Sequence, residues 1–129
     1  MKLTVQHVDG LRFLVTVGEH TVVVDAPPEE GGAGTSMSSP QLFAASVAAC
    51  ALSFVVNSCQ LHGLPVDRVS LEMDYEEAQR PRRISRMDIR IHIEPEVPAQ
   101  RCKALLGVAK HSTVANALAC PPEIRITLE

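Results

Sequence analysis

The sequence predicts an α+β fold in which antiparallel strands surround one long, buried helix. Short apolar runs near the start of the chain are separated by turn pairs, and two later runs alternate apolar with polar residues. Between these groups lies a long apolar stretch that begins with Pro and ends with Gly. Strands grouped on either side of a helix, rather than alternating with helices, indicate an α+β arrangement. The length of 129 residues predicts a single domain, residues 1–129.

The composition is that of an ordinary globular domain and argues against a nucleic-acid binder. Apolar residues make up 46% of the chain and charged residues 21%, and the net charge is −3. The basic cluster at residues 80–86 surrounds a predicted turn, where a solvated tip is expected. Residues 1–8 lack the apolar core of a signal peptide, so a cytoplasmic location is expected. The four cysteines show no CxxC spacing, which favours free thiols over disulfides.

Residues 2–25 predict three strands in an antiparallel meander. Their apolar runs are separated by Asp9-Gly10 and Gly18-Glu19, which are tight-turn pairs. The Gly-rich segment 31–34 follows, without the Lys-Ser/Thr ending of a phosphate-binding loop. We interpret it as a flexible lead-in to the helix.

Residues 39–63 predict the central helix. Ser39 is the expected N-cap, Pro40 suits the first helical position, and Gly63 suits the left-handed position after the last turn. Apolar residues occur on every face, so the helix is expected to be buried all round. The stretch is short and interrupted by serines and an asparagine, which argues against a membrane span.

The second half of the chain predicts a hairpin. Residues 69–76 and 87–94 alternate apolar with polar side chains, which indicates strands with one buried face. Residues 79–83 close the hairpin, and opposite charges on the wet faces are expected to pair across the strands.

Two helices and a last strand are expected to complete the chain. Pro98 begins the first of these helices, with Cys102 among its core positions, and Ser112 caps the second, shorter one. Apolar residues alternate with polar ones over residues 124–128, which predicts the closing strand.

Three segments of this chain resemble one known family. They are Ser39-Pro40-Gln41-Leu42-Phe43-Ala44-Ala45-Ser46-Val47-Ala48-Ala49-Cys50, His111-Ser112-Thr113-Val114-Ala115-Asn116-Ala117-Leu118 and Pro122-Glu123-Ile124-Arg125-Ile126. The first resembles the Pro-to-Cys helix start of the OsmC/Ohr family of osmotically induced and organic-hydroperoxide-resistance proteins. The second resembles that family's second cysteine motif, and the third resembles its closing strand.

The resemblance implies an OsmC-like fold and an intertwined homodimer, with two central helices packed inside a wrap of strands from both subunits. It also implies thiol-dependent reduction of organic hydroperoxides. In that reaction one cysteine attacks the peroxide, a second resolves the sulfenic acid as a disulfide, and an Arg–Glu pair tunes the first. Dihydrolipoyl groups or small thiols are the implied reductants, and no metal or flavin is implied.

Carried over onto this sequence, the resemblance assigns Cys50 as the attacking cysteine and Arg12 as the active-site arginine. Two parts of the family pattern differ. Ser112 stands at the resolving position, where a hydroxyl cannot form a disulfide, and Pro40 stands at the position of the helix-start Glu. Cys120 is the remaining resolving candidate, which requires its Cα to lie within about 7 Å of the Cα of Cys50. A cycle in which an external thiol resolves Cys50 is the preferred alternative.

Peroxide reduction requires an accessible thiolate at Cys50. The residue lies mid-helix, where the dipole of its own helix helps little because that effect fades within a turn. We hypothesise that Arg12, the helix start at Ser112 and the neighbouring His111 converge on the thiol. The alternative is a packing role, since free cysteines are among the most buried residues.

Other candidate residues follow from helical spacing. Phe43, Val47 and Phe54 fall near the Cys50 face, where they would line an apolar pocket for an alkyl hydroperoxide or belong to the core. Cys59 falls on another face and is expected in the core. Together with His62 it would need further ligands to hold a metal.

Two functions remain open from the sequence. The first is a thiol peroxidase or stress protein that reduces organic hydroperoxides through Cys50, using an external thiol. The second is a non-catalytic OsmC-like protein whose apolar pocket at the dimer interface binds a hydrophobic small molecule. A reactive Cys50 thiol favours the first function, whereas an inert thiol and a co-purified apolar ligand favour the second.

Overall fold

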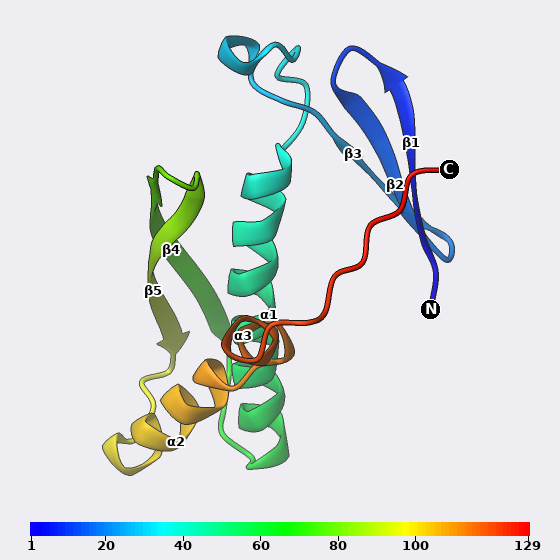
Figure 1. Cartoon of the computed structure of the whole chain (residues 1–129). Coiled ribbons are helices and arrows are strands. Elements are labelled where there is room, and N and C mark those ends of the chain that lie inside the picture. Colours follow the sequence, from blue (N-terminus) through cyan, green and yellow to red (C-terminus); the bar gives the residue numbers. More distant parts are fainter. The chain divides into compact units, whose positions relative to one another are not determined.

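The structure, a computed structural model, describes residues 1–129 as two compact units, residues 1–45 and 46–129 (Figure 1). The first unit contains β1 (Leu3–Asp9), β2 (Arg12–Val17), β3 (His20–Val24) and a 3₁₀ turn, η1 (Pro28–Glu30). The second contains most of α1 (Ser39–Leu61), then β4 (Arg68–Ala78), β5 (Arg83–Glu94), α2 (Ala99–Lys110) and α3 (Thr113–Ala119).

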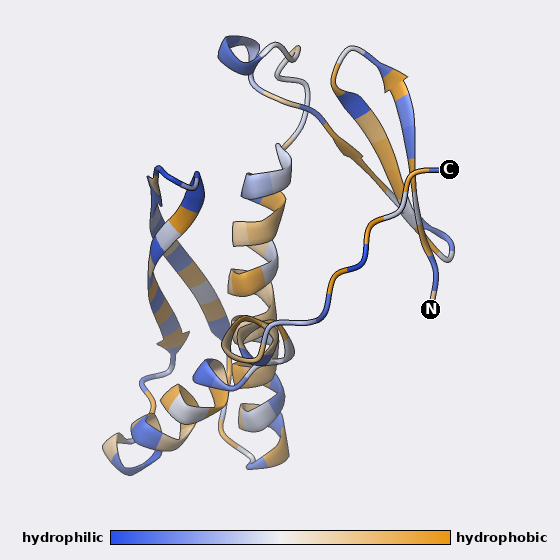
Figure 2. Cartoon of the chain, in the orientation of Figure 1, coloured by the Kyte–Doolittle hydropathy of each residue, from blue (hydrophilic) through white to orange (hydrophobic).

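The first unit confirms the predicted meander. Its strands form an antiparallel sheet in the order β1-β2-β3. Gly10 and Gly18 take positive φ angles of 46° and 58° in the two turns, a conformation that glycine adopts without steric cost. The register places apolar side chains on one face across the three strands, and most of them are exposed; Figure 2 shows the apolar residues of these strands in orange.

The loop that follows β3 is held by a buried carboxylate. Asp25 is only 3% exposed, and its two oxygens accept hydrogen bonds from the backbone N–H groups of Ala26, Ala33 and Thr35. The Thr35 hydroxyl donates to the same carboxylate at 2.6 Å. A Cβ at Gly32 would lie 1.9 Å from the Ala26 carbonyl oxygen, so only glycine fits there. The prediction of a flexible lead-in was therefore wrong, because these hydrogen bonds fix the loop.

Helix α1 confirms the predicted long helix, with its first cap one residue earlier than expected. The Ser38 hydroxyl accepts from the Gln41 N–H, and the Gln41 side chain accepts from the Ser38 N–H, which forms a capping box. At the other end Gly63 takes φ 65° and the Leu64 N–H donates to the Cys59 carbonyl, as in a Schellman motif.

The expectation that α1 is buried all round is wrong for the single chain. Only one stripe is buried, at Ala44, Val47, Ala51, Val55 and Cys59. The stripe follows the spacing of three and four residues that defines one helix face. By length and composition, α1 is the one helix here apolar enough to cross a membrane, a test that the core helix of a globular protein also passes.

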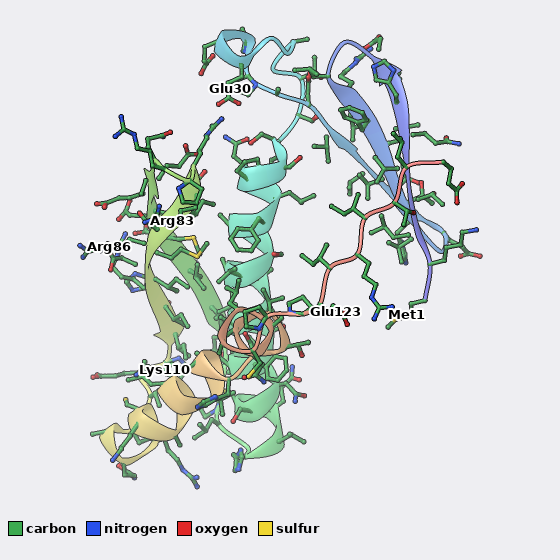
Figure 3. All side chains as sticks on the ribbon, in the orientation of Figure 1. Met1, Glu30, Arg83, Arg86, Lys110 and Glu123 are labelled. Atoms are coloured by element: carbon green, nitrogen blue, oxygen red, sulfur yellow. The ribbon has the colours of Figure 1, made fainter.

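The hairpin β4–β5 confirms the predicted pair of strands and its cross-strand charges. The two strands pair antiparallel, with Leu71 opposite Ile91 on the apolar face. On the wet face Arg90 forms ion pairs with Asp74 at 2.8 Å and with Glu72 at 3.6 Å. The hairpin tip carries the arginine cluster, and Figure 3 labels Arg83 and Arg86 there, both exposed as expected.

The core of the second unit forms where α1, α2 and the hairpin meet. Val55, Cys59 and Leu105 are its buried members, and partly buried side chains pack against them from β5 and the connecting segments. Cys59 is therefore a core residue, as predicted. Cys102 is exposed, so its prediction as a core residue was wrong: Leu105 turns inward from α2 instead.

The closing strand predicted at residues 124–128 does not form within this chain. Residues 121–129 follow α3 as an extended segment without a strand partner. Ile124, Ile126 and Leu128 are 76%, 90% and 101% exposed. A strand needs a neighbour for its backbone hydrogen bonds, and the alternating pattern alone does not supply one.

Candidate functional site

Cys50 lies in the middle of α1 as a free thiol of intermediate exposure. The buried stripe of the helix passes on either side of it, at Val47 and Ala51. The Ser53 hydroxyl donates to the Cys50 backbone carbonyl at 2.9 Å, and this hydrogen bond does not involve the thiol. Cys50 is thus positioned by a rigid element and is not enclosed by the core of its own chain.

Arg12 begins β2, directly after the first turn of the meander. Its guanidinium forms a bidentate ion pair with Asp9, with Nε donating to Oδ1 at 2.7 Å and a terminal nitrogen donating to Oδ2. The pair raises the pKa of Arg12 and lowers the pKa of the Asp9 carboxyl. Arg12 and Cys50 belong to different units, so their convergence stays a prediction.

Ser112 is completely buried and caps α3. Its hydroxyl oxygen accepts from the Ala115 N–H at 3.3 Å, which confirms the predicted capping role. His111, the C-cap residue of α2, is exposed, and its carbonyl accepts from the Asn116 side chain at 3.1 Å. Their approach to Cys50 stays a prediction.

The three apolar candidates on α1, two phenylalanines and a valine, differ in solvent exposure. Val47 is 7% exposed and belongs to the buried stripe of α1. Phe43 is 39% exposed and Phe54 is 36% exposed. Of the two interpretations, core packing therefore holds for Val47, and the two rings remain available as pocket walls.

The other cysteines differ in how deeply they are buried. Cys120 is the C-cap residue of α3 and is exposed, and its approach to Cys50 stays a prediction. Cys59 is 1% exposed and packed among aliphatic side chains. The neighbouring His62 ring bonds the Ser58 carbonyl through Nδ1 at 2.9 Å. No group of three potential metal-ligating side chains comes together in the chain.

Asp9 is the functional candidate that the sequence reading did not assign. It was interpreted only as half of a turn pair. The signal was available, since Asp9 and Arg12 stand on either side of a two-residue turn, where paired strands bring side chains together. A carboxylate that fixes a guanidinium orients its donors, and Asp9 is the acidic partner of Arg12 in this structure.

Solved structures of other proteins share this fold. An osmotic stress induced and detoxification response protein from Psychrobacter arcticus 273-4 is 24% identical, with a TM-score of 0.84, over 91% of this chain and 87% of that one. An organic hydroperoxide resistance protein OsmC from Legionella pneumophila is 22% identical, with a TM-score of 0.64, over 92% and 89%. The organic hydroperoxide resistance protein OhrB of Bacillus subtilis is 15% identical, with a TM-score of 0.60, over 91% and 90%.

The TM-scores show a common fold. Among curated proteins, none matches the chain. The family model for OsmC-like proteins matches residues 31–127, which include α1 with Cys50, the hairpin and the Ser112 motif. Because that match spans most of the sequence, the chain belongs to the OsmC-like protein family.

Proposed function

We propose that this chain reduces organic hydroperoxides through Cys50, with an external thiol as reductant. The observation that carries the proposal is a free, partly exposed thiol in mid-helix, within the segment that matches the OsmC-like family. Relatives of the same fold from Legionella pneumophila and Bacillus subtilis are organic hydroperoxide resistance proteins. The expected setting is the cytoplasm, where thiol reductants keep cysteines reduced.

The reaction proceeds by displacement at oxygen. The Cys50 thiolate attacks one peroxide oxygen, the O–O bond breaks, and the alkoxide leaves with a proton as an alcohol. Cys50 becomes a sulfenic acid. An external thiol then condenses with it to a mixed disulfide and releases water, and a second thiol exchanges to free Cys50 and carry away the disulfide.

The external thiol is needed because Ser112 stands at the resolving position. A hydroxyl cannot form a disulfide, and the Ser112 oxygen is already used as the cap of α3. Cys120 is the internal alternative, since it is free and exposed. In the proposed reaction, the Arg12–Asp9 ion pair would direct guanidinium donors at the developing charge on sulfur or oxygen.

We propose that the active form is a homodimer. Two observations support it: α1 buries only one stripe within its own chain, and the apolar residues of 124–128 are exposed. Exposed apolar surface on this scale marks an interface. A second copy would cover the rest of α1, and an apolar substrate would bind beside Cys50, with Phe43 and Phe54 as walls.

Turnover of cumene and tert-butyl hydroperoxides with dithiothreitol or dihydrolipoamide tests the proposal. Wild type is compared with Cys50→Ser, and Cys102→Ser is the matched control, because that thiol is exposed on a different helix. We expect turnover to vanish in Cys50→Ser and to persist in the control. Cys120→Ser distinguishes the two routes: unchanged turnover supports an external resolving thiol.

Equal background rates in wild type and Cys50→Ser would reject the peroxidase function for these substrates and reductants. The second function, binding of a hydrophobic small molecule at the dimer interface, would then gain support. The absence of a resolving thiol at Ser112 is the observation that favours it. Mass spectrometry of the native protein would then test for a co-purified apolar ligand.

A further inference from the structure

The second unit contains a cavity that the proposed reaction does not use. It has a volume of about 350 Å³ and lies where α1, the end of β5 and α2 meet. Val55 and Leu105 line it, and these core side chains are 2% and 8% exposed. Its volume falls in the range of small-molecule sites, roughly 300–1,000 Å³.

The walls of this cavity are almost entirely aliphatic. Ile91 and Ile93 contribute from β5, Val97 from the segment before α2, and Leu106 from α2 itself. Leu106 is 57% exposed, which places one wall in contact with solvent. An aliphatic or aryl body entering from solvent would therefore displace water from branched apolar side chains, which is favourable in proportion to the area covered.

One charged side chain lines the cavity, Glu96, in the segment between β5 and α2. It is exposed and makes no ion pair or hydrogen bond with the chain. An unpaired carboxylate beside an apolar cavity favours a cationic group and disfavours a carboxylate through charge complementarity. A fatty acid therefore matches the walls but not the charge.

We propose that this cavity binds a small amphiphilic amine, with the apolar body between β5 and α2 and the protonated amine at the Glu96 carboxylate. Cys50 is not among its lining residues, so the site is separate from the proposed peroxidase thiol. The inference goes beyond the proposed function and does not depend on it.

Cys102 lines the cavity, so the reactivity of its thiol can report whether the cavity is occupied. The thiol is free and exposed, and so is Cys120, which does not line the cavity and serves as the internal control. The experiment measures the alkylation rate of each thiol by iodoacetamide, resolved by peptide mass spectrometry. The full-length protein is incubated with n-octylamine, n-octanol or n-octanoate, which share one chain length and differ in charge.

We expect n-octylamine to slow alkylation of Cys102 and to leave Cys120 unchanged. It should act at a concentration up to about fivefold lower than n-octanoate, because an exposed ion pair contributes at most about that factor to affinity. In Glu96→Gln the two concentrations should converge. In Leu106→Lys, which adds a cation at an exposed wall and offsets the Glu96 charge, the preference should also be lost, whereas Leu118→Lys on α3 should behave as wild type.

Three results would overturn the proposal. The first is alkylation of Cys102 that none of the three probes slows. The second is equal protection by amine and carboxylate in the wild type, with no effect of Glu96→Gln. The third is a Cys102 that resists alkylation before any probe is added while Cys120 reacts, because a second copy of the chain would then fill the cavity. Hydroperoxide turnover is measured separately and bears on none of these outcomes.

Discussion

At the scale of single residues, Asp25 has the most extensive hydrogen bonding of any described side chain. Four donors converge on its carboxylate, from Ala26, Ala33 and both the backbone and hydroxyl of Thr35. The Thr35 hydrogen bonds are the main cause that lowers the pKa of Asp25 far below its usual range. These bonds favour the ionised carboxylate in the folded state, which links loop stability to pH.

Asp25→Asn is expected to destabilise the protein most at neutral pH. The Asn side chain replaces one acceptor oxygen with an NH₂ group, which is a donor. This NH₂ group would face an N–H or O–H donor that the Asp25 carboxylate accepts from in the wild type. Because the folded-state pKa is lowered, the carboxylate stabilises the fold above its unfolded value of 3.8 and loses this effect as pH falls below it. The difference between variant and wild type should therefore shrink on acidification.

Urea unfolding midpoints from about pH 7 to about pH 2 measure this effect. Asp67→Asn, at an exposed carboxylate, is the control that should show no such dependence. A constant difference between Asp25→Asn and wild type at all pH values would contradict the argument.

A second prediction at this scale concerns Ser112. Ser112→Cys replaces a buried cap, which costs about 1 kcal/mol of stability. If this position is the resolving site, the introduced thiol should form a disulfide with Cys50 after one equivalent of cumene hydroperoxide. Non-reducing peptide mapping detects the bond, and Thr113→Cys at the adjacent exposed position is the control. An introduced thiol that stays free would remove position 112 from the active site.

At the scale of elements, the sequence predicted what local chemistry determines. Tight-turn glycines gave the meander and period-two patterns gave the hairpin, because each strand pairs with its neighbour in sequence. Gly63 marked the end of α1 correctly. The first cap was misplaced by one residue, since Ser38 and Ser39 are equally good N-caps and the Gln41 side chain decides between them.

Features that depend on distant partners were less predictable. Cys102 was expected in the core as one of the apolar positions of its helix, but which face of α2 packs inward depends on α1 and β5. The strand at residues 124–128 has the correct alternation and no partner within the chain. The Arg12–Asp9 pair, in contrast, is local, and the sequence did not predict it because the turn motif was interpreted for its backbone alone.

The two faces of α2 give a matched prediction. Leu105 is 8% exposed in the core, and its neighbour Leu106 is 57% exposed. Leu105→Ala should cost about 2–5 kcal/mol, since it removes buried methyl groups and leaves a cavity. Leu106→Ala should change stability by about 0.5 kcal/mol or less. Thermal and urea unfolding measure both, and equal losses would show that α2 is not oriented as described.

At the scale of the whole molecule, one chain leaves much of its apolar surface uncovered. Much of the apolar face of the β1–β3 sheet, nearly half of α1 and the last residues are exposed, although their patterns are typical of buried elements. Small domains depend on burying such surface, because burial offsets the conformational entropy lost on folding. The contradiction between pattern and exposure resolves if the folded unit contains two copies.

The last residues provide the test of that argument. Ile124, Ile126 and Leu128 alternate with Arg125 and Thr127, so in a strand they would share one face. Burying an aliphatic side chain contributes about 1.5–3 kcal/mol, so replacing all three with Ser should raise the dimer dissociation constant by about a hundredfold or more. The double variant Arg125→Ser/Thr127→Ser changes the polar residues of the same segment. It should leave the dimer dissociation constant within about tenfold of the wild-type value. Sedimentation velocity over a concentration series measures both. A wild type that is monomeric at every concentration would reject the homodimer. Equal effects of the two variants would show that the segment pairs through its backbone without burying its apolar side chains.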